Sequence, residues 1–66
     1  MAAGTRGKLK EDLVGVHRNC DWIMQHCQRC LSLIGDDHPE LIVAFEGLHT
    51  LAKTLDDLAQ GLYSTI

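Results

Sequence analysis

The chain has 66 residues, of which 45% are hydrophobic and 23% charged, and it carries a net charge of -3. This length allows one small domain, and the balance of apolar and charged residues is that of a folded chain rather than a disordered one. The mild negative charge gives no attraction to nucleic acid or to an anionic membrane. No apolar run approaches the ~18 residues that span a bilayer. We therefore expect neither nucleic acid nor a membrane among its partners.

Two further features concern the compartment. The first seven residues are small and polar, with no hydrophobic run behind them, so they do not have the pattern of a signal peptide. Three cysteines are an odd number, which suits a reducing compartment better than a disulfide scaffold. We expect a cytoplasmic protein.

The stretch from Gly35 to Glu40 carries the signals for a tight turn between two helices. Gly35 can adopt the left-handed conformation that ends a helix. Asp37 is the expected N-cap of the next helix, Glu40 completes the capping-box spacing, and Pro39 fits the first helical turn. The sequence thus predicts a single domain over 1–66, with a disordered tail at 1–6, a helix at about 8–34, a turn at 35–38 and a helix at about 38–63.

Apolar residues recur on both predicted helices at alternating steps of three and four, the heptad pattern of a coiled coil. On the first helix they are Leu9, Leu13, Val16, Cys20, Ile23, Cys27, Cys30 and Ile34. On the second they are Leu41, Ala44, Leu48, Leu51, Leu55, Leu58 and Leu62, with Phe45, Ala52, Ala59 and Ile66 beside them. The predicted fold class is all-α, an antiparallel two-helix hairpin that resembles a coiled coil.

Counting back from the tight turn predicts which residues of the two helices meet. The expected pairs are Ile34 with Leu41, Cys27 with Leu48, Cys20 with Leu55, and Leu13 with Leu62. Arg18 is then expected near Asp56 or Asp57. An exposed ion pair of this kind selects a register rather than supplying much stability.

A hairpin of this size leaves much of its apolar surface in water, because ordering about 60 residues costs roughly 90 kcal/mol that one seam between two helices does not offset. A second copy would complete the burial, so we expect a homodimeric four-helix bundle. The residues next to the turn are apolar almost all round both helices, which favours an interface there. The expected dimer interface consists of Leu31, Leu33, Ile34, Leu41, Ile42, Val43 and Phe45.

The cysteines and histidines permit a second interpretation. Cys27 and Cys30 lie one helical turn apart and Cys20 lies two turns before Cys27, with His17 and His26 nearby. Such side chains bind zinc or copper, so a metal-binding four-helix bundle is the alternative function. Against it, all three cysteines fall on the apolar line of the helix, where a free cysteine packs as a small hydrophobic residue. His26 and His49 are also expected near each other, which would allow a pH-sensitive or metal-sensitive switch.

Trp22 falls on the side of the first helix that points away from its apolar line. Arg18, His26 and Arg29 accompany it, and tryptophan beside arginine is typical of a protein-binding hot spot. We expect these four residues to bind a partner protein. Single scattered glycines, and serines without an arranged histidine and acid, give no catalytic pattern, so we do not expect an enzyme and expect no cofactor. The predicted function is a protein–protein interaction module, such as an adaptor, inhibitor or regulator.

Overall fold

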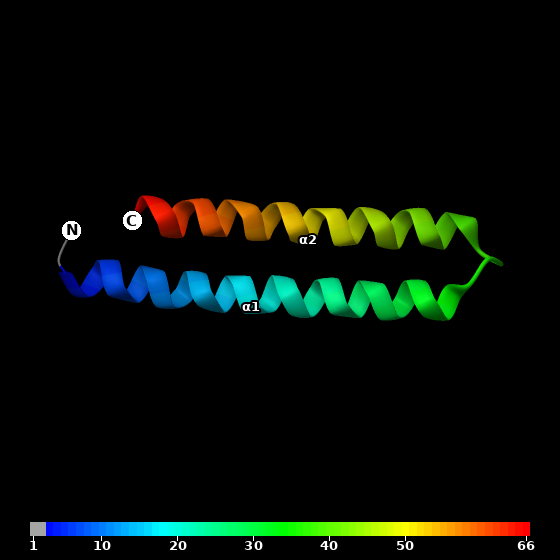
Figure 1. The fold of residues 1–66 in the computed structure, drawn as a ribbon, viewed down its shortest axis with the longest axis horizontal. Coiled ribbons are helices and arrows are strands. Elements are labelled where there is room, and N and C mark those ends of the chain that lie inside the picture. The colour runs from blue at the N-terminus through cyan, green and yellow to red at the C-terminus, as the bar shows by residue number, and fades with distance from the viewer. Residues whose placement is uncertain (1–2) are drawn as a thin grey trace.

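The structure is a computed structural model that describes residues 3–66. It consists of helix α1 (Ala3–Ile34) and helix α2 (Pro39–Thr65), and the described residues contain no strand. The two helices lie side by side and antiparallel along an elongated molecule of 54 × 14 × 11 Å (Figure 1). The predicted all-α two-helix hairpin is confirmed.

Both helices are longer than the apolar pattern indicated. Helix α1 begins at Ala3, before the expected start near Lys8, and includes Gly4 and Gly7. A glycine inside a helix costs about 1 kcal/mol, but a helix already nucleated gains a backbone hydrogen bond with each added residue. Helix α2 continues to Thr65, and Ile66 closes it by donating its backbone N–H to the Leu62 carbonyl at 3.0 Å. Residues 1 and 2 of the predicted tail lie outside the described residues.

The turn forms as predicted at its first residue and differs at its last. Gly35 has a φ of 65°, the left-handed conformation expected of a residue that ends a helix. The N-cap of α2 is His38, not Asp37, because Pro39 occupies the first helical turn and the residue before a proline is held outside the helical region. The His38 carbonyl accepts hydrogen bonds from the N–H groups of Leu41 and Ile42 at 3.0 and 3.2 Å.

The start of α2 therefore lacks a capping side chain in the described structure. Replacing His38 with serine places a hydroxyl where it can accept a hydrogen bond from a free backbone N–H of the first turn. We expect the free energy of unfolding to rise by about 1 kcal/mol. Urea denaturation followed by circular dichroism measures this change, and Asp37→Ser is the matched control that should leave stability nearly unaltered.

The side of α2 that faces α1 differs from the prediction. Cys20 and Cys27 of α1 are buried, as their place on the predicted apolar line requires. On α2 the buried residues are Ala52, Asp56 and Ala59, whereas the leucines expected opposite the cysteines are exposed. The interhelical seam, meaning the residues that face the other helix, follows heptad steps on both helices. It comprises Lys10, Leu13, His17, Cys20, Met24, Cys27, Leu31 and Ile34 of α1; Ile42, Phe45, His49, Ala52, Asp56, Ala59 and Tyr63 of α2; and Ile66, which follows α2.

Small side chains explain this choice of face. In the register set by His17 and Asp56, Cys20 lies level with Ala52, and Ala59 lies beside Leu13 and His17. A small side chain in these layers lets the two helices pack together, whereas leucines on both sides would keep them apart. The predicted pairing of the cysteines with Leu48 and Leu55 is wrong for this reason. The phase of α2 is therefore rotated by about one residue, or 100°, from the predicted one.

Two contacts between the helices define the register. His17 Nδ1 lies 2.6 Å from Asp56 Oδ1, and Lys10 Nζ lies 5.0 Å from the centroid of the Tyr63 ring. The acidic residues expected near Arg18 have other partners, because Asp56 pairs with His17 and Asp57 pairs with Lys53 at 3.6 Å. His17, the residue before Arg18, thus makes the contact with Asp56 that was predicted for Arg18.

Candidate interaction surface

The most extensive apolar feature of the described structure is an exposed line along α2, which we call the leucine face. It consists of Leu41, Ala44, Leu48, Leu51, Leu55, Leu58 and Leu62. Its leucines are between 42% and 68% exposed, with Leu51 the most exposed of them. Each member of the leucine face precedes a residue of the interhelical seam by one position. The face therefore lies about 100° around α2 from the contact with α1.

Helix α1 adds to the same side of the hairpin. Leu9, Val16, Ile23 and Cys30 also precede seam residues by one position, and Leu9 and Ile23 are both 39% exposed. When two antiparallel helices are viewed from one end, their chains turn in opposite senses. Residues that precede the seam by one position therefore lie on the same side of the hairpin in both helices. The leucine face and this line of α1 together form one continuous apolar side.

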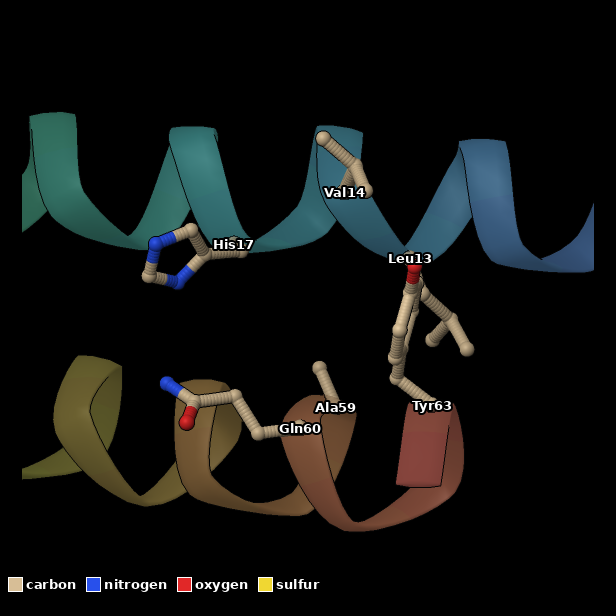
Figure 2. A pocket seen from close by; sticks show the side chains of 6 residues that line it. All are labelled: Leu13, Val14, His17, Ala59, Gln60 and Tyr63. Atoms are coloured by element: carbon tan, nitrogen blue, oxygen red, sulfur yellow. The ribbon is translucent and has the colours of Figure 1, made fainter. Parts of the chain in front are cut away.

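The opposite side of the hairpin tests this geometry. Val14 of α1 and Gln60 of α2 each follow a seam residue by one position, and both line one open groove (Figure 2). Gln28 and Glu46, which have the same offset, line a second groove. Residues that follow the seam by one position therefore lie on the same side of the hairpin in both helices. Most residues with this offset are polar, including Asp21, Thr50 and Lys53, so the hairpin has one apolar and one polar side.

The exposed area of the chain is large for its mass. A compact folded chain of 7.3 kDa exposes about 4,200 Å² of surface, whereas this chain exposes 5015 Å². The excess of about 800 Å² equals the area that one partner buries in a protein–protein interface of standard size. The only fully buried hydrophobic residues of the described chain are Cys20, Cys27, Ala52 and Ala59, which is a small core. The chain thus exposes more surface, and buries a smaller core, than a compact chain of its mass.

A polar cluster interrupts the seam where sequence reasoning expected only apolar contacts. Asp56 is 6% exposed, and its two carboxylate oxygens have separate partners. Oδ1 lies 2.6 Å from His17 Nδ1, and Oδ2 accepts a hydrogen bond from Gln60 Nε2 at 3.0 Å. Figure 2 shows the His17 ring between the two helices, on the side where Gln60 lies. The signal that could have revealed Asp56 is its place in the heptad line of Phe45, Ala52 and Ala59.

The three cysteines are free thiols with different exposure. Cys20 and Cys27 are buried in the seam, and Cys30 is half-buried on the apolar side. Burial raises the pKa of the Cys20 thiol, and the nearby Asp56 carboxylate raises it further. Among the described residues no group of three or more histidine, cysteine or acidic side chains could hold a metal ion within one chain. The thiols of Cys20 and Cys27 pack as small apolar groups.

The raised pKa of Cys20 predicts how stability depends on pH. The unfolded chain loses the Cys20 proton near its ordinary value of 9.0, while the folded chain retains it to higher pH. The folded state then binds more protons, so this contribution to stability is complete below pH 9.0 and is lost as the pH rises through the folded value. Thermal melts from pH 7 to 11 should therefore show a smaller decline for Cys20→Ala than for the unmodified chain, and equal declines would contradict the prediction.

The predicted partner-binding residues share the outward side of α1. Trp22 is 58% exposed, and its ring lies 5.9 Å from the ring of His26 at an angle of 36°. Arg18 and Arg29 are exposed and lie one and two helical turns from Trp22. These four side chains form a basic and aromatic ridge that is turned away from α2. His49 instead lies half-buried in the seam, while His26 packs on Trp22.

The residues expected at a dimer interface near the turn fall into two groups. Leu31, Ile34, Ile42 and Phe45 are half-buried on the seam, and so already contribute to the hairpin. Leu33, Leu41 and Val43 are exposed, with Leu33 85% exposed. Within residues 3–66, neither helix contains a stretch long and apolar enough to cross a membrane. Comparison with models of protein families, with curated proteins and with solved structures finds no match to this chain.

Proposed function

We propose that this protein is a non-enzymatic protein–protein interaction module that acts as a helical homodimer. In this proposal two hairpins pack through their apolar sides and complete a four-helix bundle. The observation that carries the proposal is the leucine face, whose leucines follow heptad spacing along the whole of α2 yet are about half exposed in the single chain. Exposed apolar surface of this extent usually marks an interface.

A second copy fits the leucine face in pattern and in area. Heptad spacing is the pattern by which helices pack on one another, and a symmetric dimer buries the same patch on both subunits. The chain exposes about 800 Å² more surface than a compact chain of its mass, and one partner buries an area of that size in a standard interface. The three free thiols are consistent with a reducing compartment such as the cytoplasm.

The outward ridge of α1 is the proposed site for a different protein. Trp22, Arg18, Arg29 and His26 lie away from the seam. Trp22, Arg18 and Arg29 stay accessible when the apolar side is covered, and His26 lies at the edge of that side. Tryptophan and arginine are the residues most enriched in binding hot spots. The homodimer would present two such ridges, and would act as an adaptor, inhibitor or regulator by occupying a surface of its partner.

Sedimentation equilibrium of the unmodified chain tests the dimer. We expect the mass of two chains at micromolar concentration, with dissociation and loss of helix on dilution. A chain that stays monomeric and fully helical up to millimolar concentration would overturn the proposal. The ridge is tested separately by comparing the proteins retained by the unmodified chain, Trp22→Ala and the neighbouring control Gln25→Ala; only Trp22→Ala should lose them.

A further inference from the structure

We propose that the two hairpins pack with their turns at opposite ends, so that α2 lies on α2 of the partner subunit and α1 on α1 of the partner subunit. This inference rests on the proposed homodimer and adds its geometry. It also defines the two-fold axis, which crosses the bundle near the middle of the helices. The interaction surface is the leucine face, and its occupant is the leucine face of a second copy.

Two symmetric arrangements can bring the apolar sides of two hairpins together. If the two-fold axis runs along the bundle, both turns lie at one end and α2 packs on α1 of the partner subunit. If the axis runs across the bundle within the interface, the turns lie at opposite ends and each helix packs on its own copy. Neighbouring helices are antiparallel in both cases, so the choice depends on which side chains meet.

The apolar side is wider on α2 than on α1. Residues that precede the seam by one position form two heptad lines on each helix, an inner line near the other helix and an outer line farther from it. On α2 the inner line is apolar, and the outer line is Ala44, Leu51, Leu58 and Thr65, of which only Thr65 is polar. On α1 only the inner line is apolar, because the outer line is Asp12, Asn19, His26 and Leu33. The two outer lines therefore differ in polarity.

This difference selects the arrangement. With the turns at one end, Leu51 and Leu58 would lie against the outer line of α1, where Asp12, Asn19 and His26 are polar and exposed. Burying those groups without hydrogen-bond partners is unfavourable. With the turns at opposite ends, the leucines of both outer lines meet other leucines, and the polar outer lines of α1 lie together at the solvent edge. The second arrangement buries more apolar surface and fewer polar groups.

The pairing along α2 follows from antiparallel heptad packing, in which an inner-line residue of one helix lies beside an outer-line residue of the other. Leu48 then packs beside the partner's Leu58, and Leu55 beside the partner's Leu51. The corresponding layers on α1 place Val16 and Ile23 toward the outer line of the other α1. The contact between His17 and Asp56 fixes how α1 and α2 are aligned. With that alignment, the midpoint of the α1 layers lies at about the same height along the bundle as the midpoint of the α2 layers. One axis thus satisfies both pairs of helices.

Distances between spin labels test the geometry. A label on Asp36→Cys, in a Cys30→Ala background that leaves only the buried Cys20 and Cys27, reports the separation of the two turns. We expect a separation close to the 54 Å length of the molecule. Turns at one end would instead give roughly 20 Å, since packed helices lie 8–10 Å apart. A label on Thr54→Cys, near the middle of α2, should give a short distance in either arrangement.

The outcomes separate this inference from the homodimer itself. A short distance at Thr54 with a long one at Asp36 supports both. Short distances at both positions overturn the opposite-end arrangement and leave the homodimer standing. No measurable coupling at either position overturns both, because the chain is then monomeric.

A second experiment needs no change to the cysteines. Leu48→Glu and Leu58→Lys are each expected to weaken self-association at least tenfold, because each buries a charge in an apolar layer. Mixing the two variants should favour heterodimers, since the opposite charges then meet across one layer. Native mass spectrometry of the mixture would show mainly heterodimer, whereas a statistical or absent heterodimer would contradict the proposed pairing. Leu48→Glu mixed with Thr54→Lys is the matched control.

Discussion

Replacing Leu51 with glutamate is expected to dissociate the proposed homodimer, with a rise in the dissociation constant of at least about 1000-fold. Burial of a leucine side chain contributes about 1.5–3 kcal/mol, and the two-fold axis places two copies in each interface. A carboxylate at the same place also loses solvation when it is buried. Together these terms exceed the ~4 kcal/mol that corresponds to a 1000-fold change.

The single chain has no reason to be destabilised directly by this change. Leu51 is 68% exposed in the hairpin and lies off the interhelical seam. Any loss of helix in Leu51→Glu must therefore come from loss of the dimer, and it should disappear at chain concentrations high enough to restore association. Sedimentation equilibrium gives the dissociation constant, and circular dichroism at the same concentrations gives the helix content.

Thr50→Glu is the matched control, because it adds the same charge to an exposed position next to Leu51 in sequence but on the polar side of the hairpin. We expect the control to dissociate within about a factor of three of the unmodified chain, as surface substitutions usually change free energies by less than 0.5 kcal/mol. Equal dissociation constants for Leu51→Glu and Thr50→Glu would remove the leucine face from the interface.

The parts of the fold that follow from local chemistry were predictable. Gly35 and Pro39 limit the backbone conformations available to the turn, and the heptad steps of α1 identify Cys20 and Cys27 as residues that face α2. These features depend on neighbours close in sequence. The antiparallel hairpin follows from them because six residues are too few for any other connection.

The side of α2 that faces α1 was not predictable from periodicity alone. Two heptad lines run along α2, one of leucines and one containing Phe45, Ala52 and Ala59. Hydrophobicity favours the leucines, but close packing of two helices favours a line that carries small residues, and that preference is a property of the pair of helices. His49 and Asp56 also interrupt the correct line with polar residues, which hides it from a search for apolar repeats.

The candidate site was predictable only in part, for the same reason. Trp22 could be placed on the outward side of α1, since its position depends on one helix only. The leucine face becomes a candidate interface only once the seam is known to lie elsewhere. The correction to the seam thus strengthens the expected self-association and transfers it from the residues near the turn to the whole length of α2.

The buried Asp56 leads to a prediction about the free energy of unfolding: two single substitutions should lower it, whereas their combination should not. Asp56 is 6% exposed, and His17 provides one of its two side-chain partners at 2.6 Å. Replacing His17 with leucine leaves a buried carboxylate with Gln60 as its remaining side-chain partner, which should lower the free energy of unfolding by about 1–3 kcal/mol. Asp56→Leu should cost less, because the half-exposed His17 ring can bind water instead.

The double variant His17→Leu with Asp56→Leu should be at least as stable as the unmodified chain, because well-packed apolar residues can replace a buried polar pair without loss. Urea denaturation at one fixed chain concentration measures all four proteins, and Lys53→Leu with Asp57→Leu, an exposed pair on the same helix, should show almost no coupling. What the double variant is expected to lose is precision of the register, since the His17–Asp56 contact is one of the two contacts that define it and the contact of Lys10 with Tyr63 alone remains. Broadened spin-label distances between the two helices of the double variant would reveal that loss, and a single sharp distance would show that packing alone fixes the register.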